Sequence, residues 1–176
     1  MTRAKLKKEL VESIQSFKLP TYREIPDVGL YLDQTTQYIS EYLAPLEDIV
    51  LTGSMISNYV KKGLIANPVK KQYSRDQIAY LIFIAIAKSV LSLEDLRLFI
   101  ELQKNSYPAE IAYEYFRAEF ENILFYIFGV KDQVDVVGVD DTEEKHMLRA
   151  TIITVAHKIV LDKCFSRLHQ TGFIEK

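Results

Sequence analysis

Apolar side chains recur at intervals of three and four residues along much of this 176-residue chain, the pattern of a helix with one buried face. The pattern is clear in residues 4–17, 30–43 and 108–128, and the last of these segments has an apolar face rich in aromatic side chains. Pro45 lies where the helix at 30–43 should end, and Gly129 lies where the helix at 108–128 should end. The sequence therefore predicts a mainly α fold.

The longest apolar run covers residues 78–87 and is compatible with a buried helix or a buried strand. Ser74 and Gln77 precede this run with the spacing of a capping box, which favours a helix over residues 75–89. A second serine cap starts the helix predicted at 93–103. The apolar run has ten residues, whereas a membrane-spanning helix needs about twenty.

Between the helices at 30–43 and 75–89, the sequence predicts a short helix at residues 53–62 and then a small hairpin, or wing, at residues 64–73. Gly63 suits the end of the short helix, and Asn67-Pro68 favours a turn in the wing. One face of the short helix carries Met55, Ile56, Tyr59 and Val60, and the opposite face carries Ser54, Ser57, Asn58 and Lys61.

Composition limits the classes of function. Hydrophobic residues make up 48% of the chain, so a packed core is expected, and the formal net charge of -2 indicates no particular partner. Cys164 is the single cysteine and the N-terminus lacks a signal-peptide pattern, so we expect a cytoplasmic protein without an internal disulfide. The chain contains no nucleophile elbow, phosphate-binding glycine loop or zinc-ligand spacing, so we expect neither an enzyme nor a cofactor.

Two groups of titratable residues have ordinary structural explanations. His146, His157 and Cys164 share one face of the last predicted helix, but a rise of ~1.5 Å per residue separates them by roughly 16 and 10 Å, too far for one metal ion. The segment DDTEEKH, which begins at Asp140, gathers carboxylates at the start of that helix, where they stabilise it. An acid–base or cation site there is the less favoured alternative.

The charge is distributed unevenly. Residues 49–75 contain five basic residues and no acidic one, a local charge of +5. Residues 91–144 contain thirteen acidic residues against four basic ones, a local charge of -9. A basic segment that coincides with a short helix and a wing is the electrostatic pattern of a nucleic-acid-binding surface.

The order helix pair, hairpin, helix predicts a winged helix-turn-helix, in which the second helix enters the DNA major groove and the wing contacts phosphates. Double-stranded DNA is therefore the predicted partner. Bases would be read by Ser54, Ser57 and Asn58, and phosphates would be held by Lys61, Lys62, Lys70, Lys71 and Arg75. Tyr59 and Tyr73 are further candidate contacts, with core packing as an equally supported alternative.

A resemblance to known regulators follows from the same residues. Tyr59, Gly63-Leu64, Pro68, Tyr73-Ser74-Arg75-Asp76 and Ser92-Leu93-Glu94-Asp95-Leu96 resemble, in matching order, the DNA-binding head of MerR-type regulators over residues 52–101. Over about residues 19–125, the chain more closely resembles an uncharacterised bacterial family that is related to MerR and is catalogued only as a domain of unknown function.

The resemblance implies a winged helix-turn-helix transcriptional regulator that forms a homodimer through a helix after the head. The implied organisation is an N-terminal helical arm and connection at 1–27, a DNA-binding head at 28–104 and a helical dimerisation region at 105–176. MerR-type proteins commonly have Arg-Tyr-Tyr where this chain has Ser57-Asn58-Tyr59. The missing arginine motivates the alternative, a protein-interaction module that no longer reads DNA. The resemblance identifies no small-molecule effector.

Overall fold

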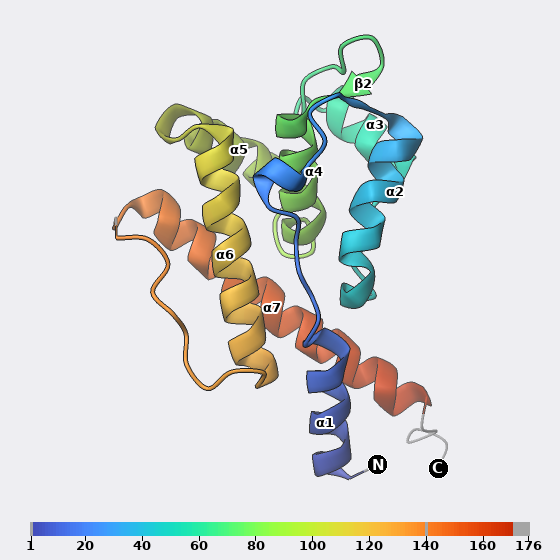
Figure 1. The fold of residues 1–176 in the computed structure, drawn as a ribbon, viewed down its shortest axis with the longest axis vertical. Coiled ribbons are helices and arrows are strands. Elements are labelled where there is room, and N and C mark those ends of the chain that lie inside the picture. The colour runs from blue at the N-terminus through green and yellow to red at the C-terminus, as the bar shows by residue number, and fades with distance from the viewer. Residues whose placement is uncertain (1, 140, 171–176) are drawn as a thin grey trace.

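The computed structural model describes residues 2–139 and 141–170, and it confirms a mainly α protein (Figure 1). The described residues form the α-helices α1 (Arg3–Ile14), α2 (Leu32–Leu43), α3 (Gly53–Lys61), α4 (Arg75–Ala87), α5 (Leu93–Ser106), α6 (Ala109–Phe128) and α7 (Glu143–Gln170), the 3-10 turns η1 (Tyr22–Glu24) and η2 (Ala44–Leu46), and the strands β1 (Leu30–Tyr31) and β2 (Gln72–Tyr73).

The predicted caps account for the helix starts. The hydroxyl of Ser74 accepts a hydrogen bond from the amide of Gln77, and the Gln77 side chain accepts one from the amide of Ser74, which completes a capping box at the start of α4. Ser92 caps α5 with its hydroxyl alone, which accepts a hydrogen bond from the amide of Asp95 at 3.1 Å. Gly129, with a φ of 75°, ends α6 in the left-handed conformation that glycine adopts without steric cost.

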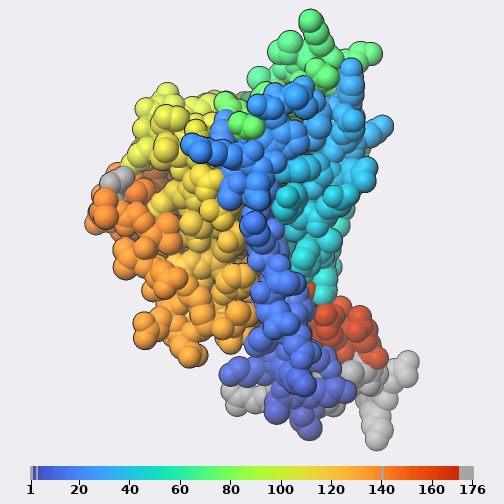
Figure 2. Space-filling model, viewed as in Figure 1, coloured from blue at the N-terminus to red at the C-terminus, as the bar shows by residue number. Residues whose placement is uncertain are grey.

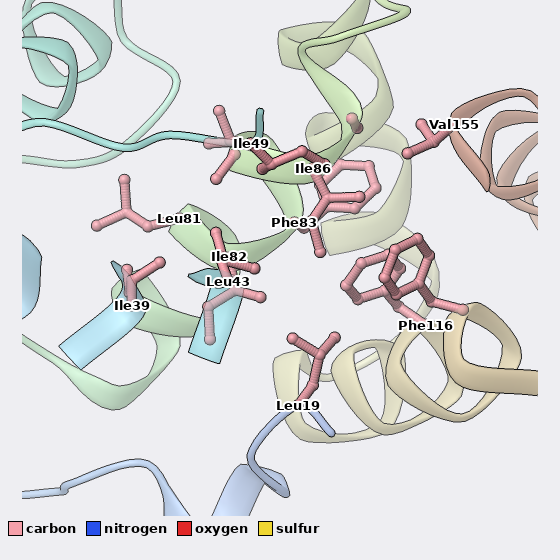
Figure 3. Packing of buried hydrophobic residues seen from close by; sticks show 14 of the residues in the cluster. Leu19, Ile39, Leu43, Ile49, Leu81, Ile82, Phe83, Ile86, Phe116 and Val155 are labelled. Carbon is pink, nitrogen blue, oxygen red and sulfur yellow. The ribbon is translucent and has the colours of Figure 1, made fainter. Parts of the chain in front are cut away.

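Helix α4 lies at the centre of the fold, and every residue from Ile78 to Ala87 except the half-buried Tyr80 is buried. Helix α2 packs on one side of α4, and α6 and α7 pack on the other (Figure 1). In Figure 3, Leu81 lies toward Ile39 of α2. Phe83 lies toward Phe116 of α6, and the two ring centroids are 5.3 Å apart in an edge-to-face contact. Helix α4 therefore contacts α2 on one side and the C-terminal helices α6 and α7 on the other.

The wing differs from the predicted hairpin. Strand β2 does not pair with residues 64–65; it pairs antiparallel with β1, with Leu30 opposite Tyr73 and Tyr31 opposite Gln72. The start of the segment predicted as helix 30–43 is thus a strand. The buried residues Leu64 and Ile65 join the core and are not available as a hairpin strand. The remaining turn of the wing is closed by a bridge between Val69 and Gln72.

The segment between α1 and β1 is fixed on the molecule by hydrogen bonds to α6. The amide of Leu19 donates to Glu121 at 2.8 Å, and the buried hydroxyl of Tyr113 donates to the carbonyl of Pro20 at 2.8 Å. Figure 2 shows this segment, in blue, lying along the surface between the C-terminal helices and α2. It brings Ile25 and Asp27 next to the start of α4.

Candidate nucleic-acid interface

Helix α3 has a buried face and an exposed polar face, as its sequence predicts. Thr52 caps the helix by accepting a hydrogen bond from the amide of Met55, and Ile56 and Tyr59 are buried. Helix α2 packs against α3, and the η2 turn and a short loop join the two helices. The exposed face carries Ser54, Ser57 and Asn58.

The three polar side chains of this face differ in what they can still bind. The hydroxyl of Ser57 donates to the carbonyl of Gly53 at 2.9 Å, and the hydroxyl of Ser54 lies 3.0 Å from that of Thr52. Asn58 makes no side-chain hydrogen bond within residues 2–139 and 141–170, so both its donor and its acceptor face solvent. An asparagine amide can bind the edge of adenine through two hydrogen bonds. Asn58 is therefore the best candidate for base recognition.

The wing presents two lysines on a tight turn. Lys70 and Lys71 have φ values of 50° and 64°, and the amide of Gln72 donates to the carbonyl of Val69 at 2.9 Å. Positive φ at both central residues is the geometry of a type I′ turn, which favours Asn-Gly. A side chain with a Cβ atom is strained there by about 1 kcal/mol per residue. Two lysines therefore occupy a turn at a cost in stability, and both are exposed.

The lysines of α3 and the wing differ from most basic residues of the described ranges in their lack of ion-pair partners. Lys61, Lys62, Lys70 and Lys71 are exposed, and none of them forms an ion pair with the described residues. Elsewhere the basic side chains are commonly paired, as Lys5 is with Glu9 and Lys158 with Asp162. The four lysines lie at the end of the molecule formed by α3 and the wing (Figure 1). Their positive charge is therefore unopposed at close range.

Arg75, predicted as a phosphate contact, has partners inside the molecule. Its Nε donates to the carbonyl of Ile25 at 2.7 Å, one terminal nitrogen lies 3.6 Å from Asp27, and the guanidinium lies 5.4 Å from the centre of the Tyr22 ring. The Tyr22 hydroxyl also donates to Asp76, and burial together with this carboxylate raises its pKa to about 12. The structure thus gives Arg75 a role in holding the N-terminal segment against α4.

Tyr59 and Tyr73, the other two predicted contacts, belong to the core. Each side chain is 4% exposed, and burial raises the pKa of both phenols. Of the two interpretations that the sequence left open, packing in the core describes their rings. Neither ring is presented for stacking on a base.

Sequence reasoning missed Lys88, which contacts the loop before α3 and a side chain of α3 itself. The ammonium of Lys88 donates to the carbonyl of Val50 at 2.6 Å and lies 3.2 Å from the Met55 sulfur, and burial lowers its pKa. These contacts fix the loop that leads into α3. No sequence signal could have found them, because 38 residues separate Lys88 from Val50.

The remaining candidate groups do not converge. His146 contacts Asp141 at 2.7 Å, and in the described ranges no three His, Cys, Asp or Glu side chains are placed to hold a metal ion. Asp140, the first residue of the acidic segment, lies outside the described residues. The described helices include none that is both long and apolar enough to cross a membrane.

The comparisons with known proteins identify a family. A family described as "Domain of unknown function (DUF1836)" matches residues 20–116. This match covers more than half of the chain, so the protein belongs to that family. No curated protein and no solved structure matches the chain. The resemblance to a domain of unknown function is thus confirmed, whereas the similarity to MerR-type regulators stays a prediction.

Proposed function

We propose that this protein is a DNA-binding transcriptional regulator of the MerR-like winged helix-turn-helix type. The single observation that supports it best is the set of exposed lysines on α3 and the wing, which have no ion-pair partner among the described residues. An exposed lysine with no neighbouring carboxylate is available to a phosphate, and the release of counterions from DNA makes each such contact favourable.

In the proposed complex, α3 lies in the major groove, and α2 packs against the face of α3 that points away from the DNA. Asn58 contacts a base edge, while Ser54 and Ser57 approach the groove with hydroxyls that already have local partners. The phosphates are held by Lys61, Lys62, Lys70 and Lys71. Arg75, Tyr59 and Tyr73 are left out of the contact set, because their side chains serve the fold.

The acidic part of the chain is compatible with this orientation. Residues 91–144 carry the excess of carboxylates, and their helices α5 and α6 lie on the other side of α4 from α3 (Figure 1). DNA bound at α3 and the wing would therefore not face the acidic surface. Such a regulator would act in the cytoplasm, where bacterial DNA is located.

The proposed regulator is a homodimer that pairs through α7. Ile153, Leu161 and Phe165 are 39%, 56% and 57% exposed and lie within one broad face of this helix, over a length of about 18 Å. An exposed apolar face of this length on a 28-residue helix suits pairing with a second copy of itself. Two copies would present two α3 helices to a two-fold symmetric DNA site.

The test is binding to duplex DNA as a function of salt concentration. Fluorescence anisotropy with the protein's own promoter region and with random duplex gives the slope of log K against log salt. Eight lysines in a dimer would give a slope of about -7 as an upper bound. Replacing Lys61 and Lys62 with glutamine should reduce the magnitude of this slope by about two per protomer. The matched control replaces Lys7 and Lys8, an adjacent pair on α1 at the other end of the molecule.

Equal slopes for both double variants would contradict the proposed interface. If the wild-type protein binds no duplex at low salt, the proposal of a DNA-binding protein is wrong. The alternative, a protein-interaction module with a similar fold, is favoured by the absence of arginine from the exposed face of α3. It predicts a partner that still binds the glutamine variant of Lys61 and Lys62.

A further inference from the structure

A cavity of about 250 Å³ lies between α4, α5, α6 and the start of α7. Its walls are formed mainly by rings and aliphatic side chains, among them Phe83 of α4, Phe99 of α5, Tyr113 and Phe116 of α6 and Leu148 of α7. Phe83 contacts both Phe99 and Phe116, with centroid distances of 5.5 and 5.3 Å. The inner wall is therefore a set of aromatic rings that already touch one another.

The cavity opens to solvent on one side and is large enough for a small organic molecule. An apolar cavity of roughly 150 Å³ is enough to bind benzene, so the volume found here suits a molecule of about ten non-hydrogen atoms. The polar lining is confined to a few side chains, among them Gln103, Glu144 and Lys145, so most of a bound molecule would contact apolar surface.

One wall of the cavity carries a short chain of hydrogen bonds. The hydroxyl of Tyr80 donates to the side-chain oxygen of Gln103 at 2.8 Å, and the side-chain Nε2 of Gln103 donates to the carbonyl of Tyr107 at 2.7 Å. All three residues line the cavity. The Tyr80 oxygen retains the capacity to accept a hydrogen bond, so the site can orient one N–H or O–H donor on an otherwise apolar ligand.

We propose that this cavity binds a flat, uncharged aromatic molecule the size of indole, and that its occupancy changes how α3 is held. The ligand would contact Ala79 and Phe83 of α4. The residues that precede them, Ile78 and Ile82, are buried in the core that α4 shares with α2. Because α4 is one rigid helix, a shift on the cavity side moves the side that packs on α2. This second part rests on the proposed function, whereas binding in the cavity does not.

A loop lies at the rim of the cavity. Gly138 lines the cavity with a φ of 74°, and a Cβ atom at this position would lie 3.2 Å from the Tyr115 ring. Val136 and Val139 on either side are 91% and 98% exposed. Gly138 therefore brings the loop against the cavity at a position where a larger residue would be strained.

The direct test is calorimetric titration of the full chain with three probes, indole, 2-naphthol and quinoline. We expect saturable 1:1 binding of at least one probe. Ala112→Phe should fill the cavity and weaken that binding at least tenfold, while Ala118→Phe, the same change on α6 at a residue that does not line the cavity, should leave it within twofold. Thermal unfolding of both variants checks that each is folded.

Two outcomes would overturn the proposal of a binding site: none of the probes saturates the folded wild-type protein, or Ala112→Phe binds as tightly as Ala118→Phe. The link to α3 has its own readout, hydrogen exchange of the α3 amides with and without the probe, which needs no DNA. A threefold or larger change in α3 exchange that Ala112→Phe removes would support the link. Unchanged exchange would refute it, even if the protein binds DNA.

Discussion

Replacing Glu47 with alanine tests whether an ion pair joins α7 to the end of the η2 turn. The carboxylate of Glu47 accepts hydrogen bonds from Lys163 at 2.7 Å and from Arg167 at 2.9 Å, both on α7. The Lys163 side chain is 1% exposed, whereas that of Glu47 is 33% exposed. Glu47 has a φ of 61°, and alanine keeps the Cβ atom, so the substitution leaves the backbone strain unchanged.

The expected loss follows from the burial of Lys163. Breaking a buried ion pair by removing one partner costs about 3–5 kcal/mol, because the other charge stays buried without compensation. Glu47 is partly exposed and solvent already screens the pair, so we expect the low end, about 3 kcal/mol. Lys163→Met should cost only about 1 kcal/mol, because it removes the buried charge and Glu47 keeps Arg167 as a partner.

The assay is equilibrium unfolding in urea of the wild type, the two single variants and the double variant. The double variant has no buried charge left at this site, so its loss should resemble that of Lys163→Met, about 1 kcal/mol, and be about 3 kcal/mol smaller than the sum of the single losses. Strict additivity, or a loss below about 0.5 kcal/mol for Glu47→Ala, would refute the account of the pair as a buried interaction.

Three further predictions follow from the same geometry. Arg75→Ala should lower the free energy of unfolding by about 2 kcal/mol, because it removes a charge-assisted hydrogen bond and a contact with the Tyr22 ring. The salt slope of DNA binding should stay unchanged, and a changed slope would restore Arg75 as a phosphate contact. Changing Lys70-Lys71 to Asn-Gly should stabilise the fold by about 1 kcal/mol or more and weaken DNA binding, measured by urea unfolding and anisotropy; unchanged DNA affinity would exclude the wing from the interface. Burial would raise the pKa of Glu47, but hydrogen bonds from Lys163 and Arg167 lower it below 4.5, so its stabilisation is complete above about pH 4.5 and is lost as the pH falls further. Acid unfolding of Glu47→Ala should therefore show a weaker pH dependence than that of the wild type.

Local signals predicted the helices well. The capping box of Ser74 and Gln77 distinguished a helix from a strand in the apolar run of α4, and Gly129 marked the end of α6. These signals act through hydrogen bonds and steric limits between residues at most a few positions apart. The boundaries agree less closely, since α1 ends at Ile14 although the buried Phe17 extends its apolar pattern.

Pairing in the wing could not be predicted in the same way. Residues 64–73 have the turn residues of a hairpin, but β2 pairs with β1, about 40 residues earlier in the chain. The choice depends on whether Leu64 and Ile65 are needed in the core, and both are buried there. Strand pairing is a competition between partners in space, which the local sequence does not describe.

The sequence by itself determined the helical elements, their caps, the polar face of α3 and the absence of acidic residues from 49 to 75, because all of these depend on neighbours along the chain. Only the tertiary structure decided which basic side chains have a hydrogen-bond or ion-pair partner within the molecule. Arg75 meets a carbonyl 50 residues away and Lys163 a carboxylate 116 residues away, while Lys61 and Lys70 meet neither among residues 2–139 and 141–170. Charge is a property of each residue, but its availability depends on what the fold places within a few ångströms of it.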